Sequence, residues 1–373
     1  MKEYSFTKLK ENIEGICAYD FQNRKGFGAG YAVCHNGTLW EGCYGTMSLK
    51  GNHPVNNRTL FRLASMTKPI TAVATLILVE QGVLSLDDSI DKFLPEFREI
   101  KIDDGNGTLS TPKCLPTVRH LLTHTSGIGS LSHKLTKMTK SDRESLSSSI
   151  AFYIKSGLDF EPGEKQIYSG TGAFDVLTKI IEIVTGGDYL SFLKKTIFTP
   201  CEMPDTTFLP SEEQMGRLVA MHQRADGENV EEPMAENCIF EQVPMTHFLG
   251  GAGLVSTLHD YCHFAELLLS EGTFRGRTIL SGETFRLLCT PQVSKEIMGG
   301  NERWGLGVRV ITEEAYPHLP KGAFGWSGAY GSHFWIDPQN QLYAVFMKNS
   351  RVDGGSANES ARKFEEAVYA SFV

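Results

Sequence analysis

Apolar residues recur with different periods in different parts of the chain, and these periods predict its elements. Residues 5–17 predict a helix at the start. Two segments, 28–34 and 38–44, then flank the pair Asn36-Gly37. Because Asn-Gly is the strongest short signal for a tight hairpin turn, these segments predict a β-hairpin.

The segment from Met66 to Gln81 predicts a buried helix. Its apolar residues cover nearly every helical face, and Gly82 supplies a stop. Proline fits an α-helix only in the first turn, where backbone N–H groups lack partners within the helix. Pro69 therefore places the start of this helix close to Ser65.

The middle of the chain, residues 86–244, is richer in helical periodicity and in turn residues. Helices are expected at 141–155, 172–186 and 188–196, with loops around 103–116 and 222–237. This part of the chain predicts a mainly helical domain.

The last third of the chain predicts one helix, several short strands and a final helix. The first helix begins at Leu254 and runs to Leu269. Strands are expected at 304–311, 333–336 and 342–348, with residues 337–340 as the turn between the last two. A helix over 358–372 ends the chain, because its apolar residues recur every four positions.

Together these elements predict an α+β fold, in which an antiparallel sheet is flanked by helices and carries an inserted, mainly helical domain. At roughly 150 residues per domain, the 373 residues suggest two domains. We expect residues 1–85 and 245–373 to form the sheet domain and residues 86–244 the helical domain. The active cleft is expected between them.

The composition argues against nucleic-acid and membrane partners. The chain is 41% hydrophobic, and its 36 Lys+Arg against 44 Asp+Glu give a net charge of −8, the wrong sign for a phosphate backbone or an anionic membrane. No run of about 18 apolar residues occurs, and the first residues lack the apolar core of a signal peptide. We therefore expect a cytoplasmic protein.

The eight cysteines predict neither a metal site nor a disulfide framework. No two of them have the C-x-x-C spacing that metal and redox sites favour. In a chain without an export signal they are expected to be reduced, partly buried thiols. No metal and no organic cofactor is expected.

An S-x-x-K tetrad can supply a nucleophile and its base, because positions i and i+3 share one helix face. Six such tetrads occur, at Ser5, Ser65, Ser89, Ser110, Ser191 and Ser360. Only Ser65 and Lys68 stand at the start of a helix that is apolar all round, where burial disfavours a charged lysine and the helix dipole favours negative charge. The alternative is that Ser65 only caps the helix and that Lys68 extends to solvent.

Six stretches of the chain together resemble the serine β-lactamase-like superfamily, within it most closely the class C β-lactamases and their esterase relatives. In order they are LFRLASMTKPITA, GVLSLDDSIDKFLPEF, LLTHTSGIG, FEPGEKQIYSGTGAFDVLTKIIEIVTG, GGAGLVST and FGWSGAYGSHFWIDPQNQL, and the similarity spans roughly residues 25–350. S-x-x-K and K-T-G are known motifs of β-lactamases and penicillin-binding proteins.

The resemblance implies three catalytic residues. Ser65 would be the acylated nucleophile, Lys68 its partner on the helix, and Tyr168 of Tyr168-Ser169-Gly170 the phenol of the second motif. A Tyr–Lys pair can accept the serine proton, pass it to the leaving group and later activate water. A phenol in contact with water alone would be too weak a base near neutrality.

The third motif of the superfamily, Lys-Thr-Gly, corresponds to Trp326-Ser327-Gly328 at a strand edge. The resemblance places the N–H of Ala329 beside that of Ser65 in an oxyanion hole. Trp326 replaces the cation near the substrate carboxylate, and Gly170 replaces an asparagine that holds an acyl amide. Both replacements favour a neutral or apolar acyl ester over an anionic amide.

Lys348 and Arg351, just after the last strand, could instead bind a substrate carboxylate. The alternative is that both are solvated residues at a strand end. Ser327 resembles the serine of a G-x-S-x-G elbow but lacks its strand-to-helix context. His259 and His263 share a helix face without the glutamate of H-E-x-x-H, and predict a core or surface pair. His124 is expected to order its loop.

We therefore expect a serine hydrolase that forms an acyl-enzyme at Ser65, of the carboxylesterase type, acting on a small-molecule ester or amide. The alternatives are a β-lactamase or D-amino-acid peptidase, and a relative without turnover that serves as a binding or assembly module. Hydrolysis and acyl transfer share the acyl-enzyme and differ only in the second nucleophile.

Overall fold

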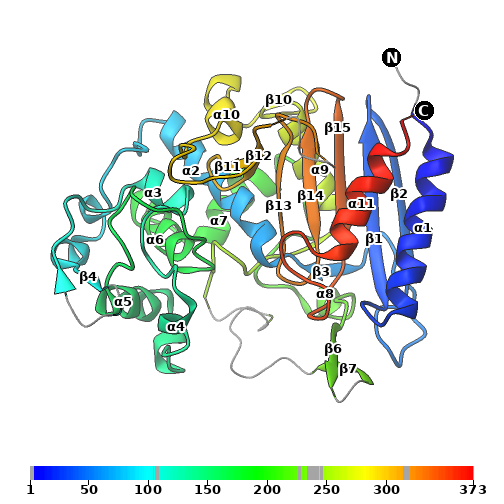
Figure 1. Cartoon of the computed structure of the whole chain (residues 1–373), viewed down its shortest axis with the longest axis horizontal. Helices are drawn as coiled ribbons and strands as arrows, with labels where there is room; N and C mark the ends of the chain where they lie inside the picture. Colours follow the sequence, from blue (N-terminus) through cyan, green and yellow to red (C-terminus); the bar gives the residue numbers. More distant parts are fainter. Residues whose placement is uncertain are drawn as a thin grey trace.

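A seven-stranded antiparallel sheet, in the order β11-β12-β13-β14-β15-β1-β2, is the largest element of the computed structural model (Figure 1). The structure describes residues 4–103, 105, 109–225, 228–232, 243, 247–313 and 319–372. The sheet strands are β1 Gly28–His35, β2 Thr38–Gly45, β11 Glu302–Trp304, β12 Arg309–Ile311, β13 Phe324–Ser327, β14 His333–Asp337 and β15 Leu342–Met347. The α+β prediction is confirmed.

Both ends of the chain build this sheet, as predicted. Strand β1 pairs antiparallel with β15, with Gly30 opposite Met347, and with β2. The hairpin turn between β1 and β2 has positive φ at Asn36 (+49°) and Gly37 (+77°), the conformation that an Asn-Gly turn supplies.

The predicted strand 304–311 is wrong, because this segment forms two strands joined by a turn. Strands β11 and β12 pair with each other, and the Gly305 N–H donates to the Val308 carbonyl between them. Gly307 has φ +74°, and a Cβ there would lie 2.7 Å from Ala72 of the buried helix α2. Glycine therefore lets the turn pack closely against that helix.

The predicted helix 254–269 begins later than expected. Val255–Thr257 forms strand β8, which pairs with β3 (Leu60–Arg62), and helix α9 spans Leu258–Leu269. The Thr257 side chain accepts a hydrogen bond from the Asp260 N–H and so caps the helix. The capping threonine separates strand from helix.

Helices cover both faces of the sheet. Helices α1 (Phe6–Gln22) and α11 (Glu359–Tyr369) lie side by side over one face (Figure 1), around a core that includes Trp335 and Phe364. Helix α9 packs against the opposite face at β14 and β15. The predicted helices at both ends of the chain are confirmed, and α1 extends beyond its expected end.

Helix α2 (Thr67–Glu80) follows a 3-10 turn at Ala64–Met66, so the expected start near Ser65 is confirmed. Pro69 lies in its first turn, and all its residues from Thr67 to Leu78 are buried. The core around α2 continues without a break into the helices of the middle of the chain.

The middle of the chain supplies most of the remaining helices. They are α3 Val118–Leu122, α4 Ser132–Leu135, α5 Leu146–Ser156, α6 Gly172–Thr185, α7 Tyr189–Leu193 and α8 Glu212–Met215, with α10 Gly282–Cys289 later in the chain. Short hairpins pair β4 Ile102–Asp103 with β5 Leu109–Ser110, β6 Met221–Ala225 with β7 Glu228–Glu232, and β9 Thr273–Phe274 with β10 Arg277–Thr278.

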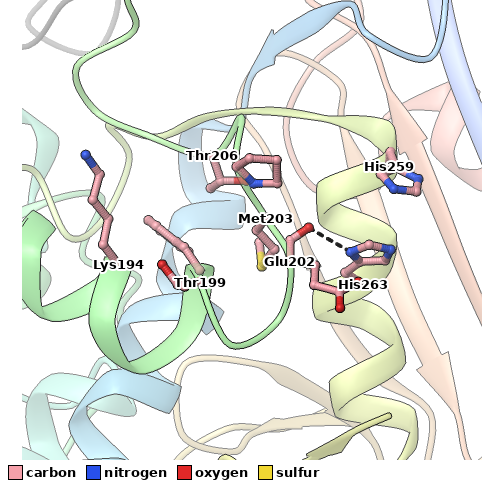
Figure 2. A pocket seen from close by; sticks show the side chains of 9 residues that line it. Lys194, Thr199, Glu202, Met203, Thr206, His259 and His263 are labelled. Carbon is pink, nitrogen blue, oxygen red and sulfur yellow. Dashed lines mark hydrogen bonds between the residues drawn. The ribbon is translucent and has the colours of Figure 1, made fainter.

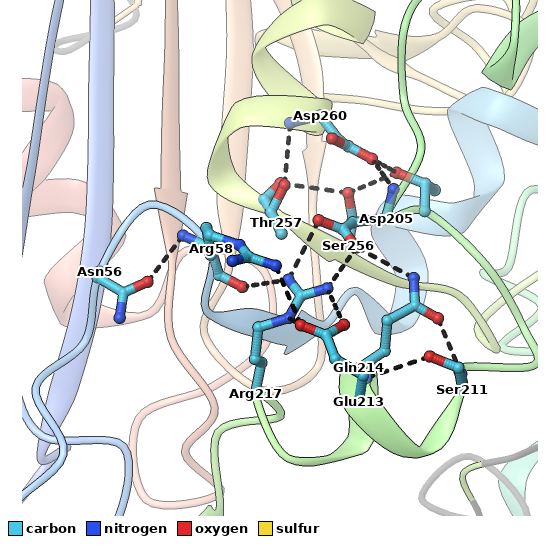
Figure 3. A network of polar contacts seen from close by, with 11 residues as sticks. Asn56, Arg58, Asp205, Ser211, Glu213, Gln214, Arg217, Ser256, Thr257 and Asp260 are labelled. Atoms are coloured by element: carbon cyan, nitrogen blue, oxygen red, sulfur yellow. Dashed lines mark hydrogen bonds and ion pairs between the residues drawn. The ribbon is translucent and has the colours of Figure 1, made fainter.

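A polar network fixes the segment that leads from these helices back to the sheet (Figure 3). The Arg217 guanidinium bonds to the carboxylates of Asp205 and Glu213 and to the Arg58 carbonyl. The buried Asp260 carboxylate accepts hydrogen bonds from the Asp205 N–H at 2.7 Å and from the Thr206 hydroxyl at 3.0 Å.

Lys348 is neither exposed to solvent at the strand end nor free to bind a substrate carboxylate, so both expectations for it are wrong. Its side chain is buried, and Nζ lies 2.7 Å from Asp353 Oδ2, 3.4 Å from Asp20 Oδ2 and 2.8 Å from Ser360 Oγ. Burial alone would raise the pKa of Asp353, but the Lys348 charge and its hydrogen bond outweigh burial and lower that pKa to about 2. The network ties α1, β15 and α11 together.

In the described part of the chain, no helix is long and apolar enough to cross a membrane. Seven cysteines are described, at positions 17, 34, 43, 114, 201, 262 and 289, and all of them are free thiols, as expected. Cys238 lies outside the described residues.

Replacing Lys348 by methionine should lower the free energy of unfolding at pH 7 by about 3–5 kcal/mol, because two buried carboxylates lose their cation. In the wild type, the stabilisation from Asp353 is present above pH 4 and is lost as the pH falls towards 2. Urea denaturation of both proteins at pH 7 and pH 2.5 should therefore show a smaller difference at pH 2.5. An equal difference at the two pH values would contradict this assignment.

Candidate active site

Three predicted side chains, those of Ser65, Lys68 and Tyr168, meet at the start of helix α2. Tyr168 Oη lies 2.7 Å from Ser65 Oγ, and Lys68 Nζ lies 3.3 Å from the same oxygen. Ser65 sits in the 3-10 turn and Lys68 in the first turn of α2, while Tyr168 comes from the segment just before α6. One hydroxyl thus contacts an amine and a phenol together.

Lys68 is fully buried, and protein atoms replace its hydration. Its Nζ donates to the carbonyls of Gly170 at 2.7 Å and Gly251 at 2.8 Å, and its third contact is Ser65 Oγ. The three contacts match the three N–H donors of an ammonium group. Among the described residues, no carboxylate lies within ion-pair distance of Lys68.

The structure also decides among the six S-x-x-K tetrads. Within the described ranges, only Ser65 and Lys68 join hydroxyl and amine directly. In three of the others the lysine pairs with a carboxylate: Lys92 with Asp88, Lys113 with Glu164 and Lys363 with Glu359.

Trp326 lies against the phenol. Its indole N–H donates to Tyr168 Oη at 3.2 Å, and the two rings lie 5.3 Å apart between centroids. The Trp304 ring stacks on Tyr168 at 5.9 Å and meets Trp326 edge-on at 4.6 Å. The sequence gives no sign that Trp304 belongs to the site, because only the turn between β11 and β12 brings it to this cluster.

His124 orders the loop beneath the phenol, as expected. It adopts φ +58°, its Nδ1 accepts the Ser169 N–H at 3.1 Å, and its ring lies 4.5 Å from that of Tyr168. Complete burial, assisted by the Lys68 charge, holds the pKa of His124 well below its usual value. The imidazole is therefore neutral and acts as a hydrogen-bond acceptor.

The end of strand β13 approaches the segment before Ser65. Strand β12 pairs with β13 only at Phe324 and Gly325, so Trp326 lies beyond that pairing. A Cβ on Gly328 would lie 2.5 Å from the Leu63 carbonyl oxygen, and only glycine allows this approach. Ala329 follows in an exposed position.

The Ser327 hydroxyl is not part of this cluster. Its Oγ lies 2.8 Å from His333 Nδ1, and His333 Nε2 lies 2.9 Å from Glu365 Oε1 of helix α11. Neighbouring residues on a strand point to opposite faces, so Trp326 faces Tyr168 while Ser327 faces α11. All three side chains of this serine–histidine–glutamate chain are buried.

Asp175 is a second residue that the sequence analysis missed. It lies in the first turn of α6, is buried, and accepts a hydrogen bond from the Tyr153 hydroxyl at 2.8 Å. The sequence does carry one sign that Asp175 is unusual: its carboxylate stands within the otherwise apolar run Gly172-Ala173-Phe174-Asp175-Val176.

His259 and His263 form the expected helix-face pair, with ring centroids 4.4 Å apart. They line a cavity of about 450 Å³ together with Lys194, Glu202 and Met203 (Figure 2). The His263 Nδ1–H donates a hydrogen bond to the Glu202 carbonyl oxygen at 2.9 Å. Among the described residues, no group of three or more His, Cys, Asp or Glu could hold a metal ion.

The chain as a whole is similar to a known protein family and to several named proteins. The family described as Beta-lactamase matches residues 17–368. Esterase EstB from Burkholderia gladioli is 29% identical over 392 residues, covering 97% of this chain and 95% of the relative. Monacolin J acid methylbutanoyltransferase from Aspergillus terreus is 25% identical over 382 residues, covering 91% and 90%.

Among solved structures, EstCE1, a hydrolase with promiscuous acyltransferase activity, superposes with a TM-score of 0.83 at 23% identity. The match covers 97% of this chain and 99% of that one. This likeness shows that the two proteins share a fold.

Gly328→Ala should lower the free energy of unfolding by about 1–3 kcal/mol, because the new methyl group must displace backbone at Leu63. Gly170→Ala is the matched control, since nothing lies within 4 Å of a Cβ built there. Urea denaturation of the two variants measures the difference. Equal stabilities would show that the approach of β13 to Leu63 is looser than described.

Proposed function

The chain belongs to the Beta-lactamase family, a family of serine hydrolases, and we propose that it cleaves carboxylic esters through an acyl-enzyme on Ser65. The observation that carries this proposal is the placement of one serine hydroxyl within contact of both Lys68 Nζ and Tyr168 Oη. A nucleophile needs an adjacent base, and a phenolate stabilised by a neighbouring ammonium can serve as one.

In the acylation step, Ser65 Oγ attacks the ester carbonyl carbon while its proton passes to Tyr168 Oη. The carbonyl oxygen becomes an oxyanion, and the N–H groups of Ser65 and Ala329 would stabilise it. When the bond to the leaving oxygen breaks, Tyr168 returns the proton and an alcohol departs.

Deacylation repeats these steps with water. Tyr168 accepts a proton from water as its oxygen attacks the acyl carbon, and Ser65 recovers a proton as its bond to that carbon breaks. Lys68 stays in contact with Ser65 Oγ throughout and stabilises negative charge on the phenol, whose ring lies 4.9 Å from Nζ.

The surroundings of the serine favour a neutral ester over a β-lactam. Trp326 offers apolar surface where a cation would bind a carboxylate, and its only polar hydrogen is already directed at Tyr168. Gly170 offers no side-chain amide, and its carbonyl is engaged by Lys68. The name of Esterase EstB, which aligns over nearly the whole chain, supports the same choice.

Acyl transfer is a second candidate function. The acyltransferase from Aspergillus terreus aligns over 91% of this chain, and an alcohol can replace water as the second nucleophile without any change in the residues described. The ratio of transfer to hydrolysis in the presence of added alcohols measures this activity.

Brief exposure to a short-chain aryl ester should acylate the wild-type protein with turnover, whereas Ser65→Ala should form no adduct and lose activity by roughly 10³-fold or more. Intact-protein mass spectrometry measures the adduct. Ser191→Ala, which removes an exposed serine from another S-x-x-K tetrad, is the matched control and should behave as wild type.

Parallel exposure to a penicillin separates the alternatives. A lasting adduct with penicillin alone would overturn the ester proposal in favour of a penicillin-recognising enzyme. Absence of label from both compounds would favour a binding module without turnover.

Trp326→Phe should lower kcat/KM for the aryl ester by about tenfold, because the phenol loses its indole donor while the aromatic packing is kept. Steady-state kinetics of the two proteins at pH 8 measures the effect. Unchanged kcat/KM would show that the hydrogen bond to Tyr168 has no part in the reaction.

A further inference from the structure

A buried carboxyl group of Asp175 lies behind the lysine of the site. Its Oδ2 accepts a hydrogen bond from the Tyr153 hydroxyl at 2.8 Å. Its Oδ1 is also buried and has no hydrogen-bond partner among the described residues. A carboxyl group in this state costs stability, since burial without full hydrogen bonding is unfavourable.

The first turn of α6 brings this carboxyl close to Lys68. The residue before it, Phe174, has its ring 5.3 Å from Lys68 Nζ. A Cβ built on Gly251 would lie 3.2 Å from Lys68 Nζ and 3.3 Å from Phe174 Cβ, so the Gly251 backbone lies beside both the lysine and this turn. The Lys68 charge lowers the pKa of the Asp175 carboxyl group, against the larger effect of burial.

We propose that Asp175 is a positioning residue that acts through Lys68: its carboxylate balances the buried ammonium when Tyr168 carries the serine proton. This inference rests on the proposed function and adds a residue to it.

The need for such a charge follows from the proton transfer itself. For Tyr168 to take the proton of Ser65, its oxygen must carry negative charge, and a Lys68 ammonium balances that charge. Once Tyr168 has taken the proton of Ser65, the phenol is neutral and the ammonium has no contacting anion in the described part of the chain. The Asp175 carboxylate, in the turn of α6 whose Phe174 ring contacts Lys68, then favours keeping the proton on Lys68 in a medium of low dielectric.

Asp175 changes its charge within the pH range in which enzyme activity can be measured. Burial raises the pKa of its carboxyl group to about 7, while the Tyr153 hydrogen bond and the Lys68 charge both oppose that rise. The titratable groups that face it are Tyr153 from α5 and Lys68 from α2. Among the described residues, Lys68 also lies near the ionisable side chains of Tyr168 and His124, and His124 is neutral.

The wild-type protein should therefore gain kcat/KM as the pH rises through about 7, the pH at which Asp175 ionises. Asp175→Asn keeps the shape of the side chain but cannot ionise. It should lower kcat for an aryl ester at pH 8 by about tenfold, with KM nearly unchanged, and should remove the rise near pH 7.

Two further variants keep the test independent of folding. Tyr153→Phe leaves the carboxyl group but removes the hydrogen bond that lowers its pKa, so the rise in activity should move to higher pH. Asp260→Asn replaces another buried carboxyl group, whose pKa burial raises to about 6 and whose hydrogen bonds go to Asp205 and Thr206, outside the site. It should affect stability alone and leave the pH profile as in the wild type.

The two proposals fail in different ways. If the wild-type protein forms an acyl adduct at Ser65 but Asp175→Asn keeps the wild-type pH profile and kcat, the role of Asp175 is overturned and the proposed function stands. A folded Asp175→Asn variant whose profile matches that of Asp260→Asn overturns that role in the same way. If the wild-type protein forms no adduct, the proposed function itself is overturned, whatever the Asp175 variants show.

Discussion

A lysine ammonium removed from water must find its hydrogen-bond acceptors in the protein, and this constraint organises the site. The Lys68 contacts come from three separate parts of the chain: the turn before α2, the segment before α6 and the glycine-rich segment before β8. None of these segments can shift without leaving a buried N–H unpaired, at a cost of about 1–3 kcal/mol. The same contacts that solvate the lysine therefore hold the serine and the phenol in place.

Local patterns in the sequence predicted the elements that depend on neighbouring residues. The Asn36-Gly37 turn, the apolar helix after Ser65 and the strands near the C-terminus all follow from spacing and turn chemistry. The resemblance to a known family named Ser65, Lys68 and Tyr168, and the structure brings these three side chains into contact.

Other features depend on partners distant in sequence and could not be predicted in this way. Lys348 at a strand end has the sequence pattern of a solvated residue, yet α1 and the segment before α11 enclose it with two carboxylates. Trp304 reaches the phenol only because Gly307 turns the chain against α2. Parts of the expected loops 103–116 and 222–237 lie outside the described residues.

The pairing of β1 with β15 has a consequence for how the chain acquires its fold. The strands that meet there are separated by some three hundred residues, since Gly30 lies opposite Met347. During synthesis, the β1–β2 hairpin therefore emerges long before its partner and must wait with one edge unpaired. Such distant pairings slow folding, because a long loop must close before the contact forms. Completion of the sheet therefore waits for synthesis of β15, and the N-terminal hairpin is exposed to misassociation until then.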